Sequence, residues 1–287
     1  MTPSPSFRAS TALPDEGIRV THPLYESVHD IKSFLSALSL VQARVMPLFL
    51  LAPFMNRSMV PRTMGYGFAA GVGLLVAPML MTQQLPTGIE LLMLLIKEAS
   101  IGIMLGYLVA IPFWIMEAVG FIVDNQRGAS MAATLNPMTG HDSSPLGLMV
   151  GFAFITFFFV SGGLQVVLGL VYDSYRLWPP LEFWPHWGVD AAELLLKQFN
   201  RLLMTALLLA APVLVAMFLS ELGLALVSRF APQLQVFFLA MPIKSALGIF
   251  VLILYATTLF DYSLEPLREL KFWASRLDPL LRLEVRP

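Results

Sequence analysis

The sequence predicts an all-α membrane protein with about six long, proline-kinked apolar helices. Of the 287 residues, 57% are hydrophobic and only 13% are charged, whereas a soluble domain carries roughly 25% charged residues. The apolar residues form continuous blocks, and about 20 consecutive apolar residues suffice to cross the bilayer core. The chain therefore lacks the polar surface that a soluble globule of this size requires.

Six apolar segments account for this pattern. They are Phe34–Met55, Met64–Met81, Ile89–Val123, Leu146–Val171, Leu202–Val227 and Leu234–Phe260. Five have the length of one span each. The third has 35 residues and would extend about 50 Å as a straight helix. We expect it to tilt, to break at Pro112 or to extend beyond the bilayer.

Prolines lie inside five of the six segments, and the fourth segment contains Gly162-Gly163 instead. The prolines are Pro47, Pro53, Pro78, Pro112, Pro212 and Pro242. Each removes a helical N–H and clashes with the preceding turn, so each predicts a kink. Proline is also commoner in membrane helices than in soluble ones, so the kinks alone indicate no function.

Three glycine pairs with four-residue spacing predict close contacts between helices, either within the chain or with partners. They are Gly67 with Gly71, Gly102 with Gly106, and Gly147 with Gly151.

The positive charges between the segments do not indicate one orientation. If every segment spans once, the arginines of the first, third and fifth loops share one side of the membrane, and the basic residues of the C-terminal tail lie on the other. The loop residues are Arg57, Arg62, Arg127 and Arg229, and the tail residues are Arg268, Lys271, Arg276, Arg282 and Arg286. Basic residues favour the cytoplasmic side. Either one segment does not span, or the helices are not simple spans.

Six charged side chains fall within the apolar segments, where a charge is unfavourable. They are Arg44, Lys97, Glu98, Glu117, Glu221 and Lys244. We favour pairing between helices, or contact with a partner subunit or a water-filled cavity, over ion coupling in a transporter. Glu221 and Lys244 lie on consecutive segments of a predicted hairpin, so we expect them to pair. Lys97 and Glu98 point about 100° apart on a helix, and we do not expect them to pair with each other.

The sequence predicts no enzymatic activity and no catalytic, cofactor or metal site. The residues His141, Asp142, Ser143 and Ser144 are adjacent, and neighbours in sequence rarely converge in space as a catalytic triad requires. The four histidines lack zinc-ligand spacing, and no glycine-rich phosphate loop follows a strand. A net charge of −1 gives no indication of a nucleic-acid partner.

Two motifs carry a family resemblance. The first is Val123-Asp124-Asn125-Gln126-Arg127-Gly128, followed by Asn136-Pro137 and Ser144-Pro145-Leu146-Gly147. The second covers residues 229–238 and continues into Met241-Pro242-Ile243-Lys244-Ser245. In this order, on this pattern of segments, they resemble the T subunit of the type III secretion export apparatus (the SctT/FliR family). The resemblance extends from about residue 34 to 262, and the lysine after Pro242-Ile243 favours the injectisome branch.

The resemblance implies a non-enzymatic subunit of an export gate in the bacterial inner membrane. Its partners would be the R and S subunits, the export switch protein (the U subunit), membrane lipid and the unfolded substrate proteins in transit. Helical hairpins would stack in a spiral assembly, with part of the chain raised toward the periplasm. The implied divisions are a polar extension (1–33), an R-like part (34–190), an S-like hairpin (191–262) and a charged tail (263–287).

The resemblance also implies a channel plug near residues 128–144, between the third and fourth segments. Its residues would be Gly128, Met131, Asn136, Pro137, Met138, Gly140 and Ser144. The polar and small composition suits a movable seal, because few apolar side chains would anchor it.

A polytopic secondary transporter for a small solute is the alternative. Such transporters often contain two matching halves with helices broken at corresponding positions. The surroundings of Pro78 and Pro212 differ, and the sequence shows no convincing internal repeat.

Overall fold

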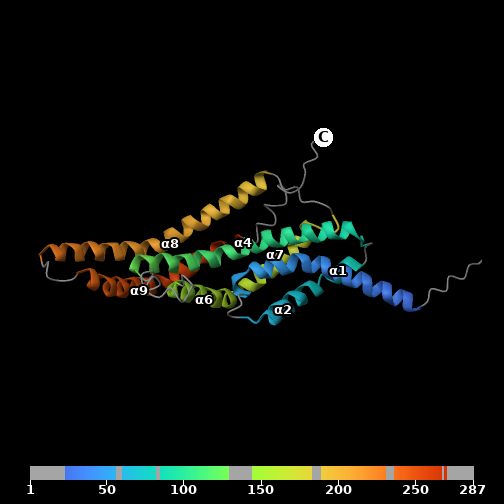
Figure 1. Ribbon diagram of the computed structural model, residues 1–287, viewed down its shortest axis with the longest axis horizontal. Helices are drawn as coiled ribbons and strands as arrows, with labels where there is room; N and C mark the ends of the chain where they lie inside the picture. The colour runs from blue at the N-terminus through green and yellow to red at the C-terminus, as the bar shows by residue number, and fades with distance from the viewer. Residues whose placement is uncertain are drawn as a thin grey trace, which may run out of the picture.

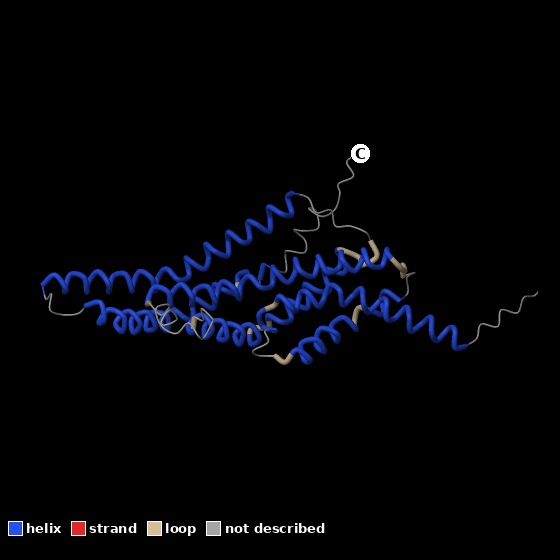
Figure 2. The backbone as a smooth tube through the Cα atoms, viewed as in Figure 1, coloured by secondary structure: helices blue, strands red, loops and turns tan. Residues whose placement is uncertain are grey.

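A computed structural model describes residues 23–55, 60–81, 85–128, 144–182, 189–230, 236–266 and 268–269. Within these ranges the chain is helical and contains no strand (Figure 2). The long helices run roughly along one axis and form an elongated bundle (Figure 1). The predicted all-α fold class is therefore confirmed.

The helices differ in number from the predicted segments. Their order is α1 (Pro23–Leu51), the 3₁₀ helix η1 (Pro53–Met55), α2 (Arg62–Leu74), α3 (Ala77–Met81), α4 (Ile89–Arg127), α6 (Pro145–Val160), α7 (Gly163–Leu177), α8 (Val189–Phe230) and α9 (Val236–Ser263). Among the described residues, four helices are long and apolar enough to cross a membrane, and the bent pair of α6 and α7 is a fifth candidate span. The predicted count of about six is thus approximate.

The second predicted segment breaks near Pro78. Helix α2 ends at Leu74, and α3 begins at Ala77. Pro78 follows Leu74 by four residues, so its ring would clash with the Leu74 carbonyl and it has no N–H to donate to that oxygen. The 13 residues of α2 extend only about 20 Å, less than the bilayer core. Helix α2 is therefore too short for a simple span, which agrees with one of the two explanations given above for the loop charges.

Helix α4 continues without a break through Pro112 over 39 residues. A break at Pro112 is therefore excluded. At 1.5 Å per residue the helix extends about 58 Å, so it must tilt or project beyond a bilayer of ordinary thickness. Pro47, Pro212 and Pro242 also lie inside continuous helices, and α8 is visibly bent partway along its length (Figure 1).

The fourth predicted segment bends by 72° between α6 and α7. Gly162 adopts a left-handed conformation with φ of +78° at this bend, which glycine tolerates without steric cost. The next residue, Gly163, packs under the ring of Phe158, and a Cβ atom there would lie 2.2 Å from Phe158 Cδ2. The two glycines thus allow the sharp turn that proline produces elsewhere.

Helix α4 is the centre of the bundle. It contacts α1, α6, α8 and α9, and 72% of its most apolar window is buried, against 17% for α9. Helix α1 approaches closely where a Cβ on Gly102 would lie 2.2 Å from Arg44 O and one on Gly106 would lie 2.9 Å from Leu48 Cα. The close contact predicted for this glycine pair is confirmed.

The other glycine pairs behave differently. A Cβ on Gly67, Gly71 or Gly151 would meet no atom within 4 Å. Gly147 alone of these makes a close contact, because a Cβ on Gly120 of α4 would lie 2.5 Å from Gly147 Cα. The pairs that include Gly67, Gly71 and Gly151 therefore do not mediate contacts as pairs within the described part of the chain.

An aromatic cluster fills the space between α4 and α6. The ring of Phe54, on η1, stacks on that of Phe158 with centroids 5.1 Å apart and lies 5.6 Å from that of Phe113. Phe154 packs edge-on against Phe113 at 5.1 Å. Such aromatic pairs stabilise packing beyond the area that they bury, so the short helix η1 is anchored between two long ones.

Candidate functional site

A buried carboxylate connects the two helices that flank the predicted plug. Asp124, in the last turn of α4, is 3% exposed. Its Oδ2 atom accepts hydrogen bonds from Ser144 Oγ at 2.5 Å and from the backbone N–H of Leu146 at 2.9 Å. We call these three residues the Asp124 clasp. It holds the end of α4 against the start of α6. The two helix ends that flank the intervening segment therefore lie next to each other.

The local sequence explains how α6 begins there. Ser144 is the N-cap residue, and its Oγ accepts a hydrogen bond from Gly147 N–H at 2.9 Å. Pro145 occupies the first helical position, where its fixed φ suits a helix start. The Asp124 carboxylate adds a negative charge at the N-terminus of α6, where the helix dipole favours one.

Two further residues complete the end of α4. Arg127 Nη2 lies 2.5 Å from Asp124 Oδ1, in an ion pair that lacks hydrogen-bond geometry. Gly128 ends the helix in the left-handed conformation, with φ of +86°, as glycine commonly does after the last helical residue.

The structure places only part of the predicted plug. Gly128 and Ser144 lie at its two ends, beside the Asp124 clasp. The other predicted plug residues, Met131, Asn136, Pro137, Met138 and Gly140, lie outside the described residues, as do His141, Asp142 and Ser143. Sequence reasoning assigned no role to Asp124, although it belongs to the first motif. The available signal was the Ser144-Pro145 capping pattern, which follows a long helix with Asp124 in its last turn.

The two charges predicted to pair on the last two helices lie together. Lys244 Nζ of α9 is 2.7 Å from Glu221 Oε2 of α8. Lys244 is 13% exposed and Glu221 is 49% exposed at the side chain, so the pair sits at the edge of the contact between the two helices. It connects α8 and α9, which pack side by side as a hairpin (Figure 1).

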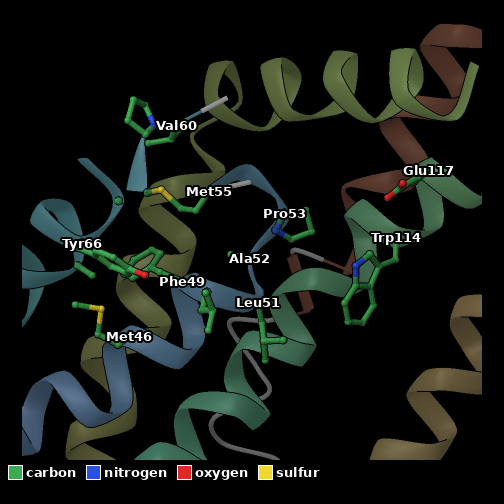
Figure 3. A pocket seen from close by; sticks show the side chains of 14 residues that line it. Met46, Phe49, Leu51, Ala52, Pro53, Met55, Val60, Tyr66, Trp114 and Glu117 are labelled. Atoms are coloured by element: carbon green, nitrogen blue, oxygen red, sulfur yellow. The ribbon is translucent and has the colours of Figure 1, made fainter. Parts of the chain in front are cut away.

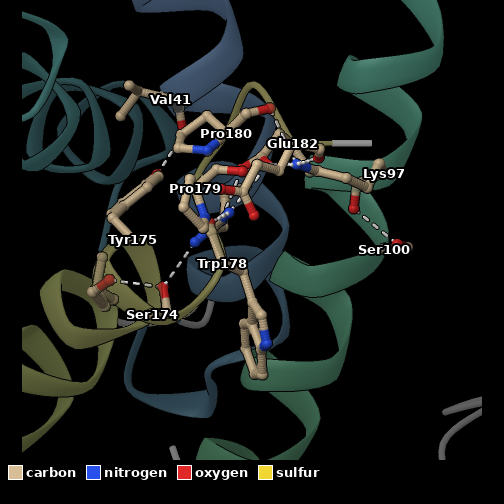
Figure 4. Close-up of polar contacts among 12 residues, drawn as sticks. Val41, Lys97, Ser100, Ser174, Tyr175, Trp178, Pro179, Pro180 and Glu182 are labelled. Carbon is tan, nitrogen blue, oxygen red and sulfur yellow. Dashed lines mark hydrogen bonds and ion pairs between the residues drawn. The ribbon is translucent and has the colours of Figure 1, made fainter. Parts of the chain in front are cut away.

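A second polar cluster is completely enclosed. Arg44 of α1 forms a bidentate pair with Glu98 of α4, with Nε–Oε2 and Nη2–Oε1 distances of 2.6 and 2.9 Å. Its guanidinium also donates to Ser174 Oγ at 3.1 Å and to Trp178 O at 2.8 Å, and its Cζ lies 4.2 Å from the centre of the Tyr175 ring. Arg44 and Glu98 are both 0% exposed. One arginine therefore connects α1, α4, α7 and the turn after α7. Figure 4 shows Ser174 and Trp178 from this region, with Lys97 reaching from α4 toward the same turn.

Lys97 extends this cluster and corrects one expectation. Its Nζ lies 2.8 Å from Glu98 Oε1, so the two neighbours do pair. Glu98 turns toward Arg44, and the long lysine side chain bends to reach the same carboxylate. Lys97 Nζ also donates to three carbonyl oxygens of the turn after α7, those of Pro179, Pro180 and Glu182, at 3.2, 2.9 and 2.9 Å.

The buried cluster contains two cations and one carboxylate. We name Arg44, Lys97 and Glu98 the α1–α4 charge cluster. Its excess positive charge faces the carbonyl oxygens of the turn after α7, and hydrogen-bonded partners are what make a buried charge tolerable. The hydrogen bonds and ion pairs of these three side chains are made to other residues of the chain, so the cluster suits a structural role that holds the helices together. Within the described residues, no group of three or more His, Asp or Glu side chains is placed to hold a metal ion.

Comparison with known proteins places the chain in one family. The family described as bacterial export proteins, family 1, matches residues 35–270. Yop proteins translocation protein T of Yersinia pestis is 40% identical over 228 residues, which cover 78% of this chain and 87% of that protein. Surface presentation of antigens protein SpaR of Salmonella typhimurium is 32% identical over 235 residues (82% and 87%). Flagellar biosynthetic protein FliR of Bacillus subtilis is 27% identical over 238 residues (81% and 91%).

Proposed function

Because the chain belongs to the bacterial export proteins of family 1, we propose that it is a subunit of the inner-membrane export gate of a bacterial type III secretion system. In this role it forms part of the channel through which unfolded proteins are secreted. The observation that carries the proposal is the family match over residues 35–270, together with relatives named for translocation, surface presentation of antigens and flagellar biosynthesis. The chain is a multi-pass membrane protein by its apolar helices.

The comparisons favour this role over a small-solute transporter. None of the three relatives is named as a solute carrier. Three of the intramembrane charges, Arg44, Lys97 and Glu98, are buried and pair with one another in the α1–α4 charge cluster. Pairing within the chain is the structural role that intramembrane charges take when they are not used for ion coupling.

The gate subunit should exist in a complex with the R and S subunits and with the U subunit. The division near residue 190 is part of the same proposal, with α8 and α9 as the S-like hairpin and the preceding helices as the R-like part. Support comes from the pairing of Glu221 with Lys244, which holds α8 and α9 together, and from their common packing against α4.

Purification in mild detergent tests the assignment. An affinity-tagged chain, expressed in the bacterium that it comes from, should elute in a complex with the R and S subunits. Mass spectrometry would identify these subunits. Deletion of the chain should abolish type III secretion. A stable monomer that binds a small solute would contradict the proposal.

We further propose that residues 128–144 form the channel plug. The supporting observation is the Asp124 clasp, which holds α4 and α6 together at the two ends of this segment. A segment whose two ends are fixed at one place can move aside without separating the helices that carry it.

Replacement of residues 129–143 by a short Gly-Ser linker tests the plug while keeping Gly128 and Ser144. The assembled complex should then leak ions when resting, measured as conductance in planar bilayers or as sensitivity of cells to small solutes. A complex of unchanged composition serves as the control for assembly. Unchanged leakage from an intact complex would contradict the plug assignment.

A further inference from the structure

Met241 belongs to the second motif, residues 229–245, and lies where α9 meets the end of α4. A Cβ atom at Gly128 would lie 3.8 Å from Met241 Cε. Because Gly128 carries no side chain and ends α4 with a φ of +86°, the methionine methyl group faces the backbone of the first residue of the proposed plug. The structure thus brings the described parts of the two sequence motifs together at one point.

The two ends of the proposed plug are held by different kinds of contact. The Ser144 hydroxyl group donates a hydrogen bond to the buried Asp124 carboxylate, which is a directional and fixed contact. Gly128 instead faces the thioether side chain of Met241. Methionine adapts to a changing neighbour, because it is unbranched and has three rotatable bonds. The Gly128 end therefore has the contact that can be lost and made again more easily.

The helix is also weakened beside this contact. Pro242 follows Met241 directly inside α9, and it has no N–H to donate to the carbonyl oxygen of residue 238. The turn of α9 that carries Met241 therefore lacks one of its hydrogen bonds. This turn can bend at a lower cost than the turns that follow it.

After its proline, α9 is fixed to α8 by two contacts. Lys244 Nζ lies 2.7 Å from Glu221 Oε2, and a Cβ atom on Gly248 would lie 2.9 Å from Met217 Sδ. Lys244 follows Met241 by three residues, so the two side chains are neighbours on the helix surface. The contact of α9 with α8 therefore determines where Met241 lies against α4.

We propose that Met241 is a positioning residue of the export gate, which holds the Gly128 end of the plug in its resting position while the Glu221–Lys244 pair holds Met241 there. The inference rests on the proposed function and deepens it, because it gives the plug a second support besides the Asp124 clasp. Displacement of α9 from α4 would remove the contact at Gly128 and leave the clasp at Ser144 intact.

Ion leakage through the assembled resting gate, measured as conductance in planar bilayers, tests this role. Met241→Ala should raise the leakage about five- to tenfold, the change in population expected when one partly buried apolar contact is lost. Met241→Leu keeps an apolar side chain of similar volume and should leak as little as the unchanged chain. Met46→Ala is the matched control, because Met46 is also partly buried but lines a cavity between α1, η1, α2 and α4 (Figure 3). It should leave leakage unchanged.

The Glu221–Lys244 pair provides a second test, which applies even if Met241→Ala prevents assembly. Glu221→Gln should raise leakage about two- to threefold, a smaller effect because the Glu221 side chain is 49% exposed. The double variant Glu221→Lys with Lys244→Glu restores a pair of opposite charges and should return leakage to normal. A charge-exchanged complex that leaks as much as the Glu221→Gln complex would contradict the role of the pair.

The Gly-Ser replacement of residues 129–143 separates this inference from the proposed function. In that background Met241→Ala should add no leakage, because both changes act on the same plug, whereas independent sites add. Normal leakage from the Met241→Ala complex, or a further rise in the linker background, would contradict this inference alone. A linker complex that does not leak contradicts the plug itself, and a chain that does not copurify with the gate subunits contradicts the proposed function.

Discussion

At the scale of single residues, burial determines how much an ion pair contributes. The Arg44–Glu98 pair is closed off from solvent on both sides, whereas the Lys197–Glu193 pair on α8 is 71% and 59% exposed at its side chains. Exposed pairs stabilise proteins little. Removing one partner of an enclosed pair leaves an uncompensated buried charge, which is strongly destabilising.

Arg44→Ala leaves the charge of Glu98 balanced by Lys97, but it removes two hydrogen bonds from the buried Glu98 carboxylate. We expect a loss of stability of about 1–3 kcal/mol for each buried acceptor left without a donor. The substitution also removes the hydrogen bonds to Ser174 Oγ and Trp178 O. Thermal unfolding of the detergent-purified protein, followed by tryptophan fluorescence, would measure the loss. Lys197→Ala is the matched control and should change the unfolding midpoint hardly at all. Equal unfolding midpoints for the two variants would show that the buried contacts of Arg44 do not stabilise the fold.

The sequence indicated which residues carry these charges but not how they pair. Angular separation along a helix argued against a contact between Lys97 and Glu98, yet both side chains reach the same place. That rule concerns Cβ directions, and long side chains can bend beyond it. The carbonyl partners of Lys97 come from a turn more than 80 residues away, which no local pattern specifies. The Glu221–Lys244 contact was easier to expect, because a short connection makes the two helices neighbours.

At the scale of helices, glycine spacing predicts close helix–helix contacts correctly at one site and not at another. Gly102 and Gly106 allow α1 to touch the backbone of α4, whereas the same spacing at Gly67 and Gly71 allows no such contact in the described chain. Two glycines four residues apart indicate that another helix can pack closely against that face. Which helix packs there depends on the tertiary structure and cannot be predicted from the spacing.

Gly102→Ala should force α1 away from α4, because the added Cβ would lie 2.2 Å from the backbone oxygen of Arg44. We expect a loss of about 1–3 kcal/mol, as for other overpacked sites. Gly151→Ala on α6 is the control, since a Cβ there meets nothing within 4 Å. Both variants would be compared by thermal unfolding in the same detergent. Equal stabilities of the two variants would show that the added Cβ causes no steric clash at Gly102.

Helix breaks were predictable where one residue causes them directly. Pro78 ends α2 by blocking the carbonyl four residues earlier, and Gly162 supplies a backbone conformation that other residues avoid. Pro112 occupies the same kind of sequence position but remains inside α4. The helices packed around α4 on several sides hold it in line, and that packing is not visible in the local sequence.

At the scale of the whole molecule, burial is unevenly distributed. Helix α4 is enclosed, whereas only 33% and 17% of the most apolar windows of α8 and α9 are buried. Much of the apolar surface therefore belongs to the outer hairpin. In the proposed gate, lipid and neighbouring subunits share the covering of this surface.

Association with the R and S subunits should consequently stabilise the chain. A partner present at 100 times its dissociation constant adds about 2.7 kcal/mol, which for a chain of this size raises the unfolding temperature by about 5 °C. Thermal aggregation of the chain, purified alone or with the two subunits, would measure the shift. Identical midpoints would place the exposed faces of α8 and α9 against lipid only.

The contact between Lys97 and its neighbour Glu98 has a consequence for biosynthesis. The ribosome must add 83 residues after Lys97 before Pro180, one of its carbonyl partners, exists. At 5–20 residues per second this takes roughly 4–17 s. During that interval the Lys97 ammonium group lacks the carbonyl oxygens of the turn after α7. Glu98 is added directly after Lys97, and Arg44 has already been made. The nascent helix thus carries a counter-ion for Lys97 into the membrane, and the later turn supplies carbonyl oxygens that face the remaining positive charge.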